Sequence, residues 1–267
     1  MKKSIEELLN WAFTQELPKV GVEEALGQGF SSAWSMMSEA ALLGQIVDRS
    51  PNCYGVVPDF VMTTAPHHDA LVVGEAVQEL AVRGNFDIPA GWNPFLDWSG
   101  EFDEVGQALL AAEADIAADL FRAASAQGRY VVTLVTRHAV LGRGPNFAAE
   151  KPLVTTQMRR GMPAWFVKRQ AKDSLKRVYE YEADGFDPKK RRPYPGAYRK
   201  FEMDRVMTGV AQARLDWQLW QDALFSLSEA LPSQLKRFEL CPFQPDRQPW
   251  VRQRKMQALS QVVENTS

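Results

Sequence analysis

The chain has 267 residues, 45% of them apolar and 24% charged, and these proportions exclude an intrinsically disordered protein. The two cysteines, Cys53 and Cys241, are too few for a disulfide framework or a four-thiolate zinc site and suit a reducing compartment. No apolar run approaches the roughly 20 residues of a membrane span, so we expect a cytoplasmic protein with no membrane partner.

The net charge of −2 conceals three zones of different charge. Residues 1–150 carry 9 basic and 20 acidic side chains, residues 151–205 carry 15 and 7, and residues 206–267 carry 7 and 6. The middle zone is therefore +8 and attracts polyanions, whereas the first zone repels them. Two interpretations stay open: a basic face that contacts nucleic acid, or cations that are neutralised by acids of the same chain or of an acidic protein partner.

Residues 1–100 are expected to form an acidic helical region. Ser4 and Glu7 have the spacing of a capping box, which predicts a helix to about Glu16, and Pro18 should end it. Further helices are expected at 31–48 and 69–83, and a short strand is expected at 54–57. Residues 85–100 are expected to form an ordered loop held in place by Trp92 and Trp98, and this loop is a candidate boundary between two lobes.

Residues 101–267 are expected to form a mixed α/β region, which either stands as a second domain or interlocks with the first. A helix is predicted at 103–126, with Val105, Leu109, Ala112, Ile116 and Leu120 on its buried face. Residues 130–135 are β-branched and predict a strand, although their continuation to 141 suits a helix equally well. Strands at 153–158, 164–169 and 177–181, joined by turns at 159–163 and 171–174, predict a small antiparallel sheet in the basic zone.

A long run of apolar residues with alternating steps of three and four follows the basic zone. Its members are Met203, Val206, Val210, Ala213, Trp217, Trp220, Leu224, Leu227 and Leu231. Such a heptad seam packs either against helices of its own chain or against a second copy in a homodimer. Two tryptophans are bulky for a two-stranded coiled coil, and Leu215 and Leu219 lie off the seam, so a central core helix is favoured. The fold class expected is α+β, mostly helical.

The strongest candidate site is the run 187–200, in which six cations surround Tyr194 and Tyr198. Arginine and lysine neutralise phosphates, and tyrosine rings stack on unpaired bases, so the mixture fits nucleic acid better than charge alone does. A solvated loop whose tyrosines pack back onto the core stays open as the alternative. The candidate nucleic-acid-binding residues are Arg159, Arg160, Lys168, Arg169, Lys172, Lys176, Arg177, Lys189, Lys190, Arg191, Arg192, Tyr194, Tyr198, Arg199 and Lys200. Lys168 and Arg169 should point to opposite faces of a strand.

Catalytic and metal-binding patterns carry less weight. His67, His68 and Asp69 are consecutive, which does not suit one metal ion, so Asp69 is expected to cap a helix. His138 reads as a structural histidine. The acids Glu101, Asp103 and Glu104 fit the start of a helix better than a magnesium site. We therefore expect no metal, no cofactor and no catalytic residue.

Three segments, LLNWAFTQELPK, RHAVLGRGPNF and DGFDPKKRRPYPGAYRKFE, resemble uncharacterised proteins encoded by bacteriophages and prophages. They cover about a fifth of the chain. The resemblance implies a genomic setting and carries no activity with it.

The sequence thus favours a non-enzymatic nucleic-acid-binding or regulatory protein, whose acidic helical half recruits partners while residues 159–200 contact phosphates of DNA or RNA. One alternative is a structural or interaction protein, oligomeric through the heptad helix, whose basic zone docks an acidic partner. A metal-dependent nuclease that uses the acids and histidines is the third alternative.

Overall fold

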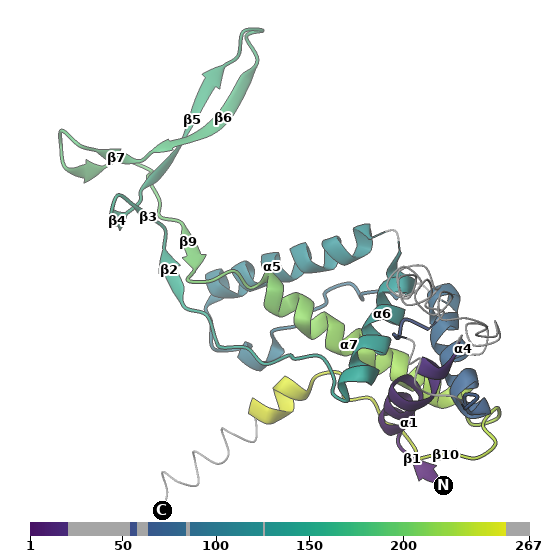
Figure 1. Ribbon diagram of the computed structural model, residues 1–267. Helices are drawn as coiled ribbons and strands as arrows, with labels where there is room; N and C mark the ends of the chain where they lie inside the picture. Colours follow the sequence, from purple (N-terminus) through teal and green to yellow (C-terminus); the bar gives the residue numbers. More distant parts are fainter. Residues whose placement is uncertain (21–53, 58–63, 84–85, 125, 255–267) are drawn as a thin grey trace, which may run out of the picture. The chain divides into compact units, whose positions relative to one another are not determined.

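The computed structural model describes residues 1–20, 54–57, 64–83, 86–124 and 126–254, which have an α+β fold (Figure 1). The helix predicted at 31–48 lies outside the described residues. The helices are α1 (Ile5–Trp11), the π-helix η1 (Ala12–Glu16), the 3-10 helix η2 (Leu17–Lys19), α4 (His68–Arg83), the 3-10 helix η3 (Leu96–Trp98), α5 (Glu104–Ala123), α6 (Gln127–Leu141) and α7 (Thr208–Ala230). Residues 249–254 are also helical, and Pro249 lies at the start of this helix, where its missing amide leaves no hydrogen bond unmade.

The strands are short and pair two by two. They are β1 (Lys2–Lys3), β2 (Val154–Thr156), β3 (Met158–Arg159), β4 (Met162–Pro163), β5 (Phe166–Lys172), β6 (Val178–Asp184), β7 (Phe186–Asp187), β8 (Arg192–Pro193), β9 (Phe201–Met203) and β10 (Glu239–Leu240). The pairs β2–β9, β3–β4, β5–β6 and β7–β8 are antiparallel, and β1–β10 is parallel. The basic zone therefore holds separate two-stranded ribbons where one small sheet was expected.

The chain divides into two compact units. Unit 1 comprises Met1–Trp92, Ala118–Phe147 and Gln212–Ser267, and unit 2 comprises Asn93–Ala117 and Ala148–Ala211. The first boundary, after Trp92, lies within the loop predicted at 85–100. Unit 1 nevertheless also takes up segments from the second half of the chain, so the units do not follow the two regions expected from composition.

The core of unit 1 is built by α1, η1, α4, α6 and the second part of α7. The predicted capping box is present: the Glu7 amide donates to Ser4 Oγ at 3.1 Å, and the Ser4 amide donates to Glu7 Oε2 at 3.0 Å. These two bonds satisfy amides that a helix start leaves unpaired. Pro18 then lies in η2, where its missing amide costs nothing.

Residues 130–135 are helical, not a strand, and lie in α6. Val131, Leu134, Val135 and Ala139 are buried, and their spacing of three, one and four is helical. Burial of this apolar stripe outweighs the β preference of the valines. Residues 54–57 form a turn and a bend where a strand was predicted.

The buried face of α5 is not the one predicted. Leu110, Ala114, Ala117 and Phe121 are buried, whereas Val105, Ile116 and Leu120 are among the exposed apolar side chains. An alanine-rich helix has apolar residues around most of its circumference, so two stripes of helical period were available. The buried stripe is the one that contains the small alanines Ala114 and Ala117, which allow close packing.

Helix α7 begins five residues later than Met203, because Glu113 fixes its first turn. The Thr208 amide and hydroxyl both donate to Glu113 Oε2, the amide at 2.7 Å. Met203 consequently lies on β9, and Val206 lies before the helix with its side chain 77% exposed, so the seam is shorter than predicted. Trp220, Leu224, Leu227 and Leu231 are buried in the core of one chain, which leaves these four side chains inaccessible to a second copy.

Asp69 links the start of α4 to the segment before β10. Its carboxylate is fully buried and accepts the amides of Lys236, Arg237 and Phe238 at 3.1, 2.8 and 3.2 Å. Asp69 was predicted to cap a helix, but its carboxylate binds the backbone of a segment that is distant in the sequence. Burial raises the pKa of Asp69, but the hydrogen bonds from Arg237, Lys236 and Phe238 outweigh burial and leave the pKa below its ordinary value.

Replacing Asp69 by Ala should lower the free energy of unfolding by about 3 kcal/mol, because three buried amides lose a charged acceptor. Urea unfolding of wild type and variant measures this difference. Glu75, an exposed acid on the same helix, provides the control, and Glu75→Ala should change the stability by less than about 0.5 kcal/mol.

The stabilisation from Asp69 should also depend on pH in one direction. A carboxyl whose pKa is lower in the folded chain stabilises the fold above the unfolded pKa of about 3.9, and this contribution is lost as the pH falls through the folded pKa. The stability difference between wild type and Asp69→Asn should accordingly shrink below about pH 4. A difference that stays constant down to the acid transition would contradict the assignment.

Candidate nucleic-acid interface

The predicted basic zone folds as a series of paired strands in unit 2, which we call the basic arm and define as residues 153–204. At one end β2 pairs with β9, with Val154 opposite Met203 and Thr156 opposite Phe201. The chain then passes through the β3–β4 hairpin, the longer β5–β6 ribbon and the β7–β8 hairpin before it returns in β9 (Figure 1).

The three hairpins meet at a junction held by backbone hydrogen bonds. Phe166 and Tyr198 exchange two such bonds, at 2.9 and 2.8 Å. The Gly185 amide donates to the Trp165 carbonyl at 2.7 Å, and its carbonyl accepts the Tyr194 amide at 2.8 Å. A Cβ at Gly185 would lie 2.8 Å from the Phe166 backbone, so only glycine permits this close approach.

The β5–β6 ribbon separates its acids from its tyrosines by strand alternation. Lys168 lies opposite Glu182 and Gln170 opposite Glu180, and the register places these four side chains on one face. Arg169 lies opposite Tyr181 and Ala171 opposite Tyr179 on the other face. That second face, formed by residues 167, 169, 171, 179, 181 and 183 of the described ribbon, carries no acid. Lys168 and Arg169 thus point to opposite sides, as predicted.

Several predicted phosphate contacts are already neutralised by acids of the arm itself. Arg159 pairs with Asp184 at 3.2 Å, Arg177 pairs with Asp173 at 2.9 Å, and Lys200 pairs with Glu182. Lys200 and Tyr198 hydrogen-bond to Glu182 and lower its pKa. The acids involved lie between residues 173 and 184, so the neutralisation of these cations is local to the arm.

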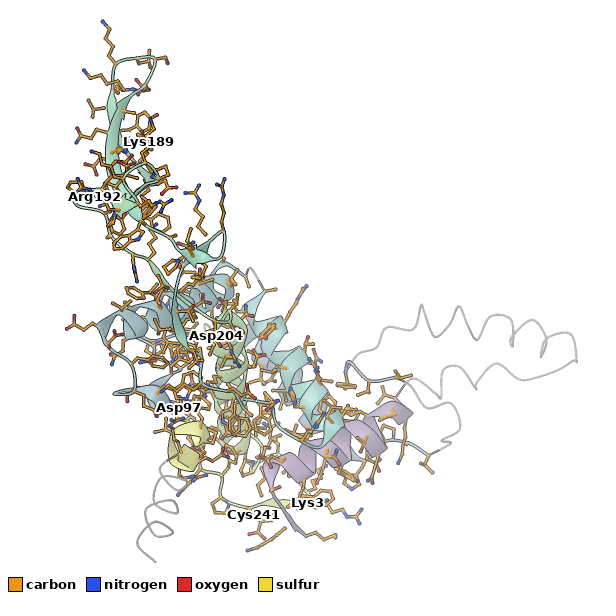
Figure 2. All side chains as sticks on the ribbon, turned by 90° about the vertical axis from the view of Figure 1, so that its left-hand side faces the viewer. Lys3, Asp97, Lys189, Arg192, Asp204 and Cys241 are labelled. Carbon is orange, nitrogen blue, oxygen red and sulfur yellow. The ribbon has the colours of Figure 1, made fainter. Side chains whose placement is uncertain are left out.

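Seven of the ten remaining cations of the arm lie at or beside the turns, whereas Lys168, Arg169 and Arg199 do not. Arg160 lies in the β3–β4 turn, Lys172 and Lys176 lie at the tip of the ribbon, and residues 189–191 lie in the β7–β8 turn, with Arg192 directly after it on β8. None of these has a carboxylate within ion-pair distance among the residues that the structure describes. Asp187, the last residue of β7, lies opposite Arg192 in the strand pair, but its carboxylate accepts the backbone amides of Lys189 and Lys190 at 2.9 and 3.2 Å. Figure 2 shows the side chains of Lys189 and Arg192 on the arm.

Aromatic rings lie beside the arginines of the arm. The Arg169 guanidinium lies 5.2 Å from the ring centre of Tyr194, and that of Arg199 lies 4.6 Å from Trp165. The Tyr198 hydroxyl donates a hydrogen bond to Glu182. Tyr179 and Tyr181 are about half exposed, with ring centres 6.1 Å apart, and were missed as site residues. Their spacing of two in YEYEAD was the available signal.

The other candidate sites are occupied by structural contacts. Asp103 accepts the Gly106 amide at the start of α5, and Glu101 pairs with Lys151 at 2.7 Å. His138 Nδ1 lies 2.9 Å from the Arg143 carbonyl, and burial lowers the pKa of this histidine. His67 Nδ1 accepts the Asp69 amide at 3.1 Å. Within the described ranges no three His, Cys, Asp or Glu side chains lie together as metal ligands, and no helix is long and apolar enough to cross a bilayer.

Neither a protein-family model nor a curated protein nor a solved structure matches the chain. The interpretation of the arm therefore rests on its own residues.

The junction provides a test of this geometry. Gly185→Ala should force the Phe166 backbone away from Tyr198 and raise the amide exchange rates at Phe166 and Tyr198 by roughly tenfold, since about 1–2 kcal/mol of hydrogen bonding is lost. Hydrogen–deuterium exchange measures both amides. Gly209→Ala is the matched control, because a Cβ there meets no neighbouring atom, and it should leave exchange in the arm unchanged.

Proposed function

We propose that this chain is a non-enzymatic nucleic-acid-binding or regulatory protein of the phage type, and that its basic arm contacts phosphates. The observation that carries the proposal is the set of turn cations, Arg160 and residues 189–192, which have no carboxylate partner in the described structure. Unpaired guanidinium and ammonium groups displace the counterions condensed on a nucleic acid when they contact its phosphates. Ion-paired groups must first give up their carboxylate partners. The low cysteine content supports a cytoplasmic setting.

The composition of the two faces of the β5–β6 ribbon supports nucleic acid as the ligand over anions in general. Arginine and tyrosine share the acid-free face of the β5–β6 ribbon, where Arg169 lies between Tyr181 across the strand pair and Tyr194 of the neighbouring loop. Aromatic faces and guanidinium planes both stack on bases. The acid-bearing face, with Glu180 and Glu182, is expected to point away from the phosphates.

The proposal narrows the sequence-based set of contacts. Arg160, Arg169, Lys189, Lys190, Arg191 and Arg192 are assigned to the interface, together with Lys172 and Lys176 at the ribbon tip. Arg159, Arg177 and Lys200 are assigned to holding the arm together because each pairs with an acid of the arm, and Lys168 is added because its charge acts on Glu182, which lies opposite it.

Changing Lys189, Lys190, Arg191 and Arg192 together to Ala should make the dependence of log K on log salt shallower by about 3, since each lost phosphate contact removes roughly 0.7–0.9 from the slope. Fluorescence anisotropy of labelled oligonucleotides across a salt series measures the slope. Variant and wild type should unfold at the same urea concentration, because these side chains are exposed.

The control removes the same charge from elsewhere. Arg122, Arg129, Arg137 and Lys236 are exposed cations of unit 1, and changing these four to Ala should leave the slope within about 1 of wild type. Equal effects of the two quadruple variants would mean that total charge, not the turn, governs binding. A wild type with no salt-dependent affinity for DNA or RNA would refute the proposal in favour of an acidic protein partner.

A further inference from the structure

A pocket of about 450 Å³ lies at the junction of the basic arm. It is lined by the β3–β4 hairpin, by the corner between β6 and β7, and by Arg199. Close approach at Gly185 brings these segments together, because Gly185 joins β6 to β7 and bonds to Trp165 and Tyr194. The pocket is therefore a consequence of the junction and lies entirely within unit 2.

The lining of this pocket is aromatic and cationic. Trp165, Phe186 and Pro188 contribute flat apolar surfaces, and Arg159, Arg160 and Arg199 contribute guanidinium groups. Its one carboxylate, Asp184, is engaged twice, by the Arg159 side chain at 3.2 Å and by the Phe186 amide at 3.0 Å. The lining carries three positive charges and one negative charge, so an anion is attracted to its edge.

The Arg199 guanidinium lies over the Trp165 ring, 4.6 Å from its centre, and both residues line the pocket. Unpaired bases are recognised by stacking of this kind, on aromatic rings and on guanidinium planes. A volume of 450 Å³ is within the range of small-ligand sites and is ample for one base with its sugar. Arg160 has no carboxylate partner in the described structure and lies at the same pocket, where it is available to the adjoining phosphate.

We infer that the pocket binds one unstacked base, so that the arm takes single-stranded nucleic acid as its ligand. The inference rests on the proposed function and adds the class of nucleic acid. Bases within a duplex stay stacked and paired and do not enter a pocket of this kind without being extruded. Phosphates contact the turn cations, while the base lies against Trp165 and Phe186.

The decisive comparison holds the phosphates constant. A thymidine oligonucleotide and an abasic strand, both of about 20 nucleotides, carry the same charge and differ in their bases. Wild type should bind the thymidine strand roughly 5- to 150-fold more tightly, which is the range that one stacked base contributes. A duplex is the less informative comparator, because its higher charge density alone raises affinity.

Two variants at Trp165 connect this discrimination to the pocket. Trp165→Leu should weaken binding of the thymidine strand toward that of the abasic strand and leave abasic binding unchanged, whereas Trp165→Phe should retain the preference. Phe201→Leu is the control, since Phe201 is an exposed aromatic of the same arm outside the pocket. The quadruple Ala variant of residues 189–192 should instead bind the thymidine strand and the abasic strand more weakly by the same factor.

The outcomes separate the inference from the proposed function. Equal, salt-dependent binding of both strands by wild type overturns the pocket assignment and leaves phosphate binding standing. Absence of salt-dependent binding to any oligonucleotide overturns both. Complete competition by polyglutamate at equal charge concentration overturns the inference in favour of an acidic protein segment as occupant. If Trp165→Leu still prefers the thymidine strand over the abasic strand, the base binds elsewhere, and the inference is overturned as well.

Discussion

The close approach of Gly185 to the Phe166 backbone is the constraint on which the geometry of the basic arm depends. It permits the bonds from Gly185 to Trp165 and Tyr194, and it lies beside the two bonds between Phe166 and Tyr198. Three hairpins are thereby fixed to one another by main-chain contacts, which do not depend on the identity of the surface side chains. The turns can then carry cations that take no part in holding the fold together.

Strand alternation explains how an arm that contains acids can still offer a surface to an anion. In the β5–β6 ribbon the acids occupy alternate positions and share one face with Lys168, while Arg169 and the tyrosines occupy the other. Local pairing then satisfies Arg159, Arg177 and Lys200. The net charge of the whole zone therefore includes cations that are already paired with acids. It also does not show that the acids of the ribbon lie on a different face from Arg169 and the tyrosines. The relevant quantity is the number of cations that form no ion pair with an acid of the arm.

The parts of the fold that were predictable are those set by local chemistry. The capping box of Ser4 and Glu7, the helix of α4 and the hairpin turn at Arg160 and Gly161 follow from short-range spacing. The parts that failed depend on distant partners: Glu113 sets the start of α7, a tertiary stripe decides α6, and Asp69 binds residues 236–238. In the candidate site the cations were recognisable by composition, but their division into paired and unpaired groups required the strand register. Trp165 and Phe186 were missed because only the junction brings them together.

Short two-stranded ribbons bury little apolar surface, and this limits what the aromatic residues of the arm can be doing. In the described arm only Ala164 and Gly185 are buried, so Trp165, Phe186 and Tyr194 remain partly exposed although they lie at or beside the junction. A large ring at such a position stabilises the arm only in part, and its remaining face is free for another flat group. Structural support and ligand binding are thus compatible in the same side chains. A ligand that covers these rings would also stabilise the arm, because binding to the folded form alone shifts the folding equilibrium toward it.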